Sequence, residues 1–91
     1  MADAQTLSVA ERLRALLADL LGLNAARATA LDADSGLFGT MPELDSMAVA
    51  GLLTEIEDQF GIIIDDEDVD SDMLGTFGAL TAYIERKLQK V

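Results

Sequence analysis

The first stretch with a helical pattern of apolar and polar positions follows Ser8. Ser8 and Glu11 have the spacing of a capping box, in which the serine accepts a hydrogen bond from the first turn and the glutamate bonds back to the serine N–H. Gly22 and Asn24 are stop signals, so we predict a core helix between Ser8 and Gly22. The polar face carries no excess of basic residues, which argues against a helix on a membrane surface. The apolar stripe consists of Val9, Leu13, Leu16, Leu17 and Leu20.

A second helix is predicted to begin directly after Asp45. The short carboxylate of Asp45 can accept hydrogen bonds from the free N–H groups of a first helical turn, so this residue is a good N-cap. Ser46 then occupies the first helical position, with its hydroxyl facing outward. The apolar residues that follow at helical spacing are Val49, Leu53, Ile56 and Phe60.

A third long helix is predicted after Thr76, which is a good N-cap. Cations in the final turns suit the negative end of the helix dipole. Arg86, Lys87 and Lys90 occupy these turns. The predicted apolar stripe consists of Phe77, Leu80, Ile84 and Leu88.

The connection between Gly22 and Asp45 is long for a compact domain, which indicates a function or hidden local structure. Residues 25–30 are expected to form a short helical turn. We expect three apolar residues to hold the loop on the helices, and three turn-forming residues to shape it. The apolar residues are Leu31, Leu37 and Phe38, and the turn-forming residues are Gly36, Gly39 and Pro42.

The segment after Phe60 is predicted to contain a short helix. The three isoleucines at 62–64 are too few for a helix and have the composition of a buried extended connector. Asp65 or Asp66 then caps a short helix that ends near Val69. The expected fold is therefore all-α: a small four-helix bundle with a long first loop and a short third helix, in a single domain over residues 1–91.

Composition excludes several functions. Six basic and 17 acidic residues leave a formal net charge of −11, which argues against nucleic acid and membrane surfaces and favours a partner with a basic surface. The chain has no cysteine and no histidine, hence no thiol of its own and no general base near neutral pH. No apolar run approaches the roughly 18 residues that span a bilayer. We therefore expect a cytoplasmic, monomeric protein that is not an enzyme.

The charge is unevenly distributed along the chain. No basic residue lies between positions 28 and 85, whereas fourteen of the 17 acidic residues do. Acidity alone promotes solubility, but one negative field over the middle of the chain also suits recognition by basic patches on other proteins.

One acidic segment has a competing interpretation. Asp66, Asp68, Asp70 and Asp72 alternate as the first ligands of an EF-hand calcium loop do. Counted from Asp66, however, Ser71 stands where that loop requires glycine, and Phe77 stands where it requires a bidentate glutamate. The segment therefore predicts a solvated acidic face or weak association with divalent cations, and no dedicated metal site.

The pair Asp45-Ser46 is by itself only a capped helix start. The wider pattern, however, resembles the acyl carrier protein family, also called phosphopantetheine-binding or thiolation domains. The two flanks of the chain fit the family's first and last helices. The matching segments are Leu37-Phe38, Leu44-Asp45-Ser46-Met47, and residues 55–61, 62–68 and 76–80.

The resemblance implies a function. The serine of the Asp-Ser pair carries 4′-phosphopantetheine in that family, so Ser46 is expected to receive this arm from coenzyme A through a phosphopantetheinyl transferase, with Asp45 beside it. The arm supplies the thiol that the chain lacks and presents an acyl group to enzymes with basic surfaces. Expected partner-binding residues are Met47, Glu55, Glu57, Asp58, Asp65, Asp66, Glu67 and Asp68.

Three alternatives stay open at this level: an aminoacyl or peptidyl carrier, a non-covalent acidic helical adaptor, and a weak divalent-cation-binding protein. The approach to the serine also differs from the common Leu-Gly-x-Asp-Ser form of carriers, because Pro42-Glu43-Leu44 precedes the pair. This form is similar to a subgroup of bacterial carriers associated with exosortase and exopolysaccharide loci.

Overall fold

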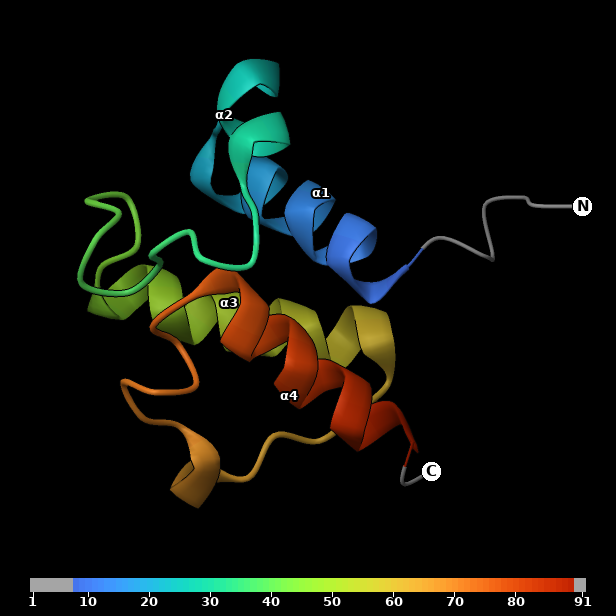
Figure 1. Cartoon of the computed structure of the whole chain (residues 1–91). Helices are drawn as coiled ribbons and strands as arrows, with labels where there is room; N and C mark the ends of the chain where they lie inside the picture. Colours follow the sequence, from blue (N-terminus) through green and yellow to red (C-terminus); the bar gives the residue numbers. More distant parts are fainter. Residues whose placement is uncertain (1–7, 90–91) are drawn as a thin grey trace, which may run out of the picture.

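Four α-helices and one 3-10 turn follow one another in the computed structural model, which describes residues 8–89 (Figure 1). The described part of the chain contains no strand, and its nearest approach to a sheet is one isolated antiparallel bridge between Gly36 and Thr76. The all-α prediction is therefore confirmed. The elements are α1 (Val9–Leu21), α2 (Ala25–Ala30), α3 (Ser46–Phe60), the 3-10 turn η2 (Asp66–Asp68) and α4 (Phe77–Gln89).

Helix α1 begins and ends as its sequence predicts. The Ser8 hydroxyl accepts from the Glu11 N–H at 3.1 Å, and the Glu11 carboxylate accepts from the Ser8 N–H at the same distance. Gly22 ends the helix in the left-handed conformation, with φ of 69°. Asn24 accepts from the Arg27 N–H at 2.8 Å, so this predicted stop signal is also the N-cap of α2.

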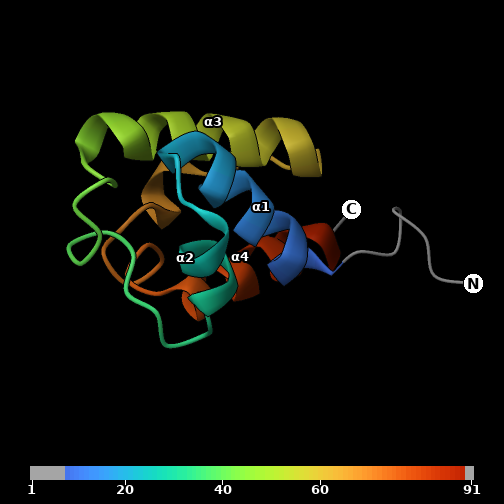
Figure 2. The same cartoon turned by 90° about the horizontal axis from the view of Figure 1, so that it is seen from above.

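Helix α1 lies at the centre of the bundle, where it contacts each of the other three α-helices. It lies above α3 and α4 in Figure 1, and the view from above shows it in front of them (Figure 2). Leu13, Leu16 and Leu17 are buried as predicted, but Leu20 remains 38% exposed, so its assignment to the core was wrong. The side chains that lose all or nearly all contact with solvent are Leu13, Leu17, Leu37, Leu52, Ile56, Leu80 and Ile84.

The buried face of α3 differs from the prediction by one position. Ile56 and Phe60 are buried as expected, whereas Val49 and Leu53 are only partly buried. Leu52, which was not predicted, is fully buried. Both leucines fit helical spacing, so periodicity alone does not decide which one faces the core.

The long loop is fastened to the start of α4 by backbone hydrogen bonds. The Leu37 N–H donates to Gly75 O, and the Phe77 N–H donates to Ser35 O, both at 2.9 Å. Leu31 and Leu37 are buried as expected, but Phe38 is 39% exposed, so its predicted role in holding the loop on the core was wrong. The loop that leads to α3 is thus held against α4.

The connector after α3 is extended, and its side chains alternate. Ile62 and Ile64 are buried, but Ile63 is 76% exposed, which contradicts a connector buried throughout. The predicted short third helix is the single 3-10 turn η2, and Asp65 precedes it without a side-chain capping bond. Thr76 caps α4 as predicted, accepting from the Ala79 N–H at 3.1 Å. Phe77, Leu80 and Ile84 are buried, and Leu88 is partly buried.

All five basic residues within residues 8–89 contact other parts of the chain. Arg12 and Arg14 on α1 donate to the Gln59 and Leu31 carbonyl oxygens at 2.6 and 2.9 Å. Lys90 lies outside the described residues. The other contacts join Arg27 to Glu43, Arg86 to the Tyr83 ring, and Lys87 to Asp65. None of the helices in the described part of the chain is long and apolar enough to cross a membrane.

Candidate functional site at the start of α3

Ser46 is the first residue of α3 and is exposed. Asp45 caps the helix: its carboxylate accepts from the Ala48 N–H at 2.9 Å, and its carbonyl accepts from the Val49 N–H at 2.9 Å. The N–H groups of Ser46 and Met47 and the Ser46 hydroxyl have no hydrogen-bond partner among residues 8–89. The predicted geometry is thus confirmed, and free donors at a helix N-terminus suit an anion such as phosphate.

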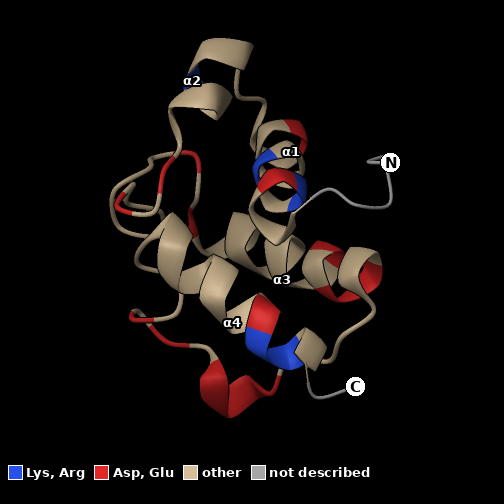
Figure 3. Ribbon diagram, turned by 45° about the vertical axis from the view of Figure 1, so that its right-hand side comes forward, with Lys and Arg blue, Asp and Glu red and all other residues tan. Residues whose placement is uncertain are grey.

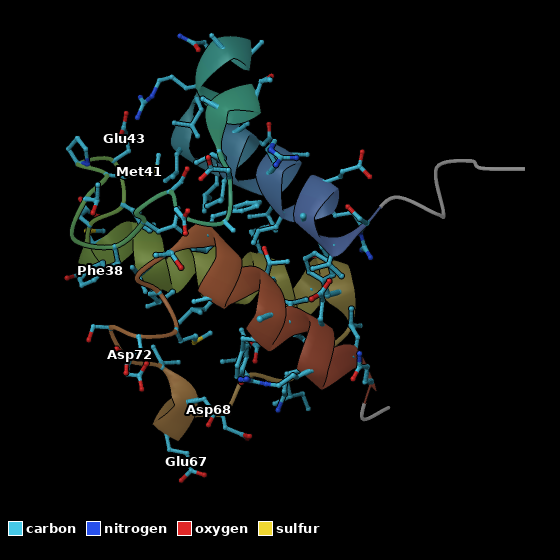
Figure 4. All side chains as sticks on the ribbon, viewed as in Figure 1. Phe38, Met41, Glu43, Glu67, Asp68 and Asp72 are labelled. Carbon is cyan, nitrogen blue, oxygen red and sulfur yellow. The ribbon has the colours of Figure 1, made fainter. Side chains whose placement is uncertain are left out.

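The segment before Ser46 is held by two contacts of different kinds. Leu44 is buried in the core. Glu43, labelled in Figure 4, forms an ion pair with Arg27 of α2. Both terminal nitrogens of the guanidinium donate to the carboxylate: Nη1 donates to Oε2, and Nη2 donates to Oε1 at 3.1 Å. The hydrogen bond from Arg27 is the main reason why the pKa of Glu43 falls to about 2. Sequence analysis missed this pair, because its members are sixteen positions apart with no local pattern.

The predicted partner-binding residues do not form one patch around Ser46. Met47 lies beside it and is 86% exposed. Glu55, Glu57 and Asp58 lie toward the other end of α3, and Glu55 is about 13 Å along the helix axis from Ser46. Figure 3 shows these acids on the last turns of α3 and a further acidic group on η2.

Several of these acids have structural partners. Glu57 accepts from the Ile64 N–H at 2.8 Å and so ties α3 to the connector, and Asp65 pairs with Lys87 at 3.3 Å. Asp68 accepts from the Tyr83 hydroxyl at 2.9 Å. Burial, and then this bond, raise the pKa of Tyr83 to about 12. Asp58, Asp66 and Glu67 are exposed. Partner binding by these acids stays a prediction.

The alternating aspartates do not converge on a common point. Asp70 accepts from the Met73 N–H at 2.8 Å and Asp68 is engaged by Tyr83, so the two point to different partners. Within residues 8–89, no group of three or more Asp, Glu, His or Cys side chains is placed to hold a metal ion. The geometry therefore gives no support to the EF-hand-like interpretation.

Comparisons with known proteins agree on one family. The family described as "Phosphopantetheine attachment site" matches residues 11–84. An acyl carrier protein from Exiguobacterium sp. is 46% identical over 44 residues, which cover 48% of this chain and 53% of that protein. The chain thus matches about half the length of this curated relative.

The fold is also similar to a solved structure. The solution structure of a holo acyl carrier protein from Nitrosomonas europaea superposes with a TM-score of 0.82 and 37% sequence identity, covering 91% of this chain and 99% of the other. Together, the family match and this similarity show that the chain belongs to the phosphopantetheine attachment site family as an acyl carrier protein, a carrier and not an enzyme, whose prosthetic group is 4′-phosphopantetheine.

Proposed function

We propose that Ser46 carries the 4′-phosphopantetheine arm and that the chain presents an acyl group on this arm to enzymes with basic surfaces. The observation that supports the assignment most directly is the exposed Ser46 hydroxyl at the N-terminus of α3, with no hydrogen-bond partner among residues 8–89. The arm supplies a thiol that holds the acyl group as a thioester, which this chain without cysteine cannot provide.

The residues around Ser46 fit a phosphate ester. The N–H groups of Ser46 and Met47 are free within the described chain, and the positive end of the α3 dipole lies at the same place. Asp45 opposes a second negative charge there, although its carboxylate is also held by the Ala48 N–H. We therefore expect transfer from coenzyme A by a phosphopantetheinyl transferase to use a divalent cation that screens this repulsion.

The charge of the chain indicates what kind of surface the partners have. Acids lie on the last turns of α3 and on η2, and all the basic residues within residues 8–89 are engaged in contacts of the chain itself. A basic surface on a transferase or an acyl-processing enzyme is therefore complementary to either of these acidic segments. Such attraction raises the rate of encounter, and the tether raises the effective concentration of the acyl group at the partner.

Intact mass spectrometry tests the proposal. The protein is incubated with coenzyme A and a promiscuous phosphopantetheinyl transferase, and the mass should rise by one phosphopantetheinyl group located on Ser46. Ser46→Ala should stay unmodified. Ser8, Ser35 and Ser71 are internal controls, since the Ser8 and Ser35 hydroxyls already make hydrogen bonds within their own turns. An unchanged wild-type mass, or a modified Ser46→Ala variant, contradicts the assignment.

A further inference from the structure

An open hollow of about 580 Å³ lies beside Ser46. Loop residues 38–42 and Leu44 form its wall, and Asp45 and Ser46 close it at the start of α3. The Ser46 side chain is thus part of the lining. The hollows beside Tyr83 and beside Phe77 do not include Ser46.

The wall of this hollow has an apolar side chain that the core does not bury. Phe38 is 39% exposed, although its neighbour Leu37 is fully buried. Met41 is only partly buried and lies on the same loop (Figure 4). Together with Pro42, these side chains leave apolar surface next to the Ser46 hydroxyl, the proposed point of attachment. A ligand that covered this apolar surface would remove it from water, which is favourable.

The loop that forms the hollow is fixed by its own hydrogen bonds. The Phe38 N–H donates to Leu74 O at 3.0 Å, and the Met41 N–H donates to Leu37 O at 2.8 Å. The pair between Glu43 and Arg27 anchors the loop on the side of α2. A ligand that enters the hollow therefore has little loop to order, which lowers the free-energy cost of binding.

We propose that this hollow is a resting site for the arm, with the geminal dimethyl segment next to the phosphate packed on Phe38 and Met41. The inference rests on the proposed attachment at Ser46. A short tether produces effective concentrations in the millimolar range, so a weak apolar contact is enough to hold the arm for much of the time. A partner enzyme must then draw the arm out of the hollow.

Fluorine and methyl NMR on the full chain test the contact directly. The chain has three phenylalanines, of which Phe60 and Phe77 are buried and Phe38 lines the hollow. In protein labelled with 4-fluorophenylalanine, conversion from the apo to the holo form should shift the Phe38 signal and leave the other two in place. Nuclear Overhauser effects should connect the geminal methyls of the arm to the Phe38 ring and the Met41 methyl.

Attachment alone can shift the Met47 methyl signal, because this residue follows Ser46. A shift of that signal is therefore not evidence for the resting site. The buried Met73 serves as a distant control. An unmoved Phe38 signal, or the absence of Overhauser effects from the geminal methyls to the hollow, overturns the resting site. Intact mass is measured on the same sample. If Ser46 is not loaded, the proposed function fails and this inference fails with it.

A matched pair of variants provides a second readout. Phe38→Ala removes apolar surface from the hollow, whereas Leu20→Ala removes an equally exposed side chain from α1, at 38% against 39%. We expect the melting temperature of the wild-type protein to rise on conversion to the holo form. The rise should be lost in Phe38→Ala and retained in Leu20→Ala. The same rise in both variants would show that the arm does not rest on Phe38.

Discussion

Arg27 of α2 holds Glu43 through both terminal nitrogens of its guanidinium, and Glu43 lies three positions before Ser46. Among residues 8–89, these are the only hydrogen bonds that join loop residues 39–44 to a helix. The pair therefore couples the short helix α2 to the segment that presents the candidate attachment site. Its strength depends on the charge of Glu43 and so on pH.

The first prediction concerns the titration of Glu43. Its carboxylate signal in ¹³C NMR should titrate with a midpoint near 2, and Arg27→Gln should return the midpoint toward 4.5. Because the folded-state pKa is lowered, the pair stabilises the fold above pH 4.5, and this contribution is lost as the pH falls toward 2. Arg86→Gln, on α4 beside Tyr83, is the matched control and should leave the Glu43 midpoint unchanged.

The second prediction concerns Tyr83, the only tyrosine of a chain without tryptophan. Its absorbance should titrate with a midpoint near 12, raised first by burial and then by the bond to Asp68. Asp68→Asn should lower the midpoint only in part, since burial remains, and Asp66→Asn on the same turn should not change it. The raised pKa means that the associated stability is complete below pH 10 and is lost as the pH rises toward 12. A wild-type midpoint at 10 would contradict the buried hydroxyl.

The third prediction compares two helical glycines with different surroundings. A Cβ at Gly51 meets only Leu20 Cδ1, at 3.9 Å. Gly51→Ala should therefore raise the free energy of unfolding by about 1 kcal/mol, through helix propensity. At Gly78, whose N–H donates to Ala33 O, a Cβ lies 2.7 Å from that oxygen. Gly78→Ala should destabilise the protein by roughly 1–3 kcal/mol.

Urea denaturation at one pH measures both variants. Equal effects of the two substitutions would contradict the close approach of α4 to the loop at Ala33. A destabilised Gly51→Ala variant would instead show that α1 and α3 pack more tightly around Leu20 than the structure indicates.

The fourth prediction concerns salt. Fourteen acids lie between positions 28 and 85, and the ion pairs within residues 8–89 neutralise only Glu43 and Asp65 among them. Screening relieves repulsion that is stronger in the folded chain than in the unfolded one. The melting temperature of the unmodified protein should therefore rise with sodium chloride and with millimolar magnesium. A saturable effect of micromolar calcium that magnesium does not reproduce would point to a metal site instead.

The sequence by itself determined where α1, α3 and α4 begin, and hence the helix position of Ser46. Ser8 with Glu11, Asp45 with Ala48 and Thr76 with Ala79 are all pairs three positions apart. Such capping bonds form within one turn, so the residues that make them are close in the sequence as well as in space. The helix position of Ser46 follows from the same local rule, whereas its selection as the candidate serine came from the resemblance of the wider pattern to acyl carrier proteins.

Only the tertiary structure decided which apolar residues enter the core. Leu52 and Leu53 have the same chemistry and both fit helical spacing, yet Leu52 is fully buried and Leu53 only partly. Phe38 and Ile63 remain exposed, although their neighbours Leu37, Ile62 and Ile64 are buried. Periodicity identifies a helical or extended segment, but the partner that covers one of its faces lies far away in the sequence.

The surroundings of Ser46 were likewise decided by tertiary contacts. The ion pair of Arg27 with Glu43 and the loop that forms the hollow depend on residues separated by sixteen or more positions, such as Phe38 and Leu74. No local rule relates such residues, since an ion pair or a backbone bond between separate elements requires only that folding bring them together. The sequence therefore located the candidate serine, whereas the folded chain determined what lies beside it.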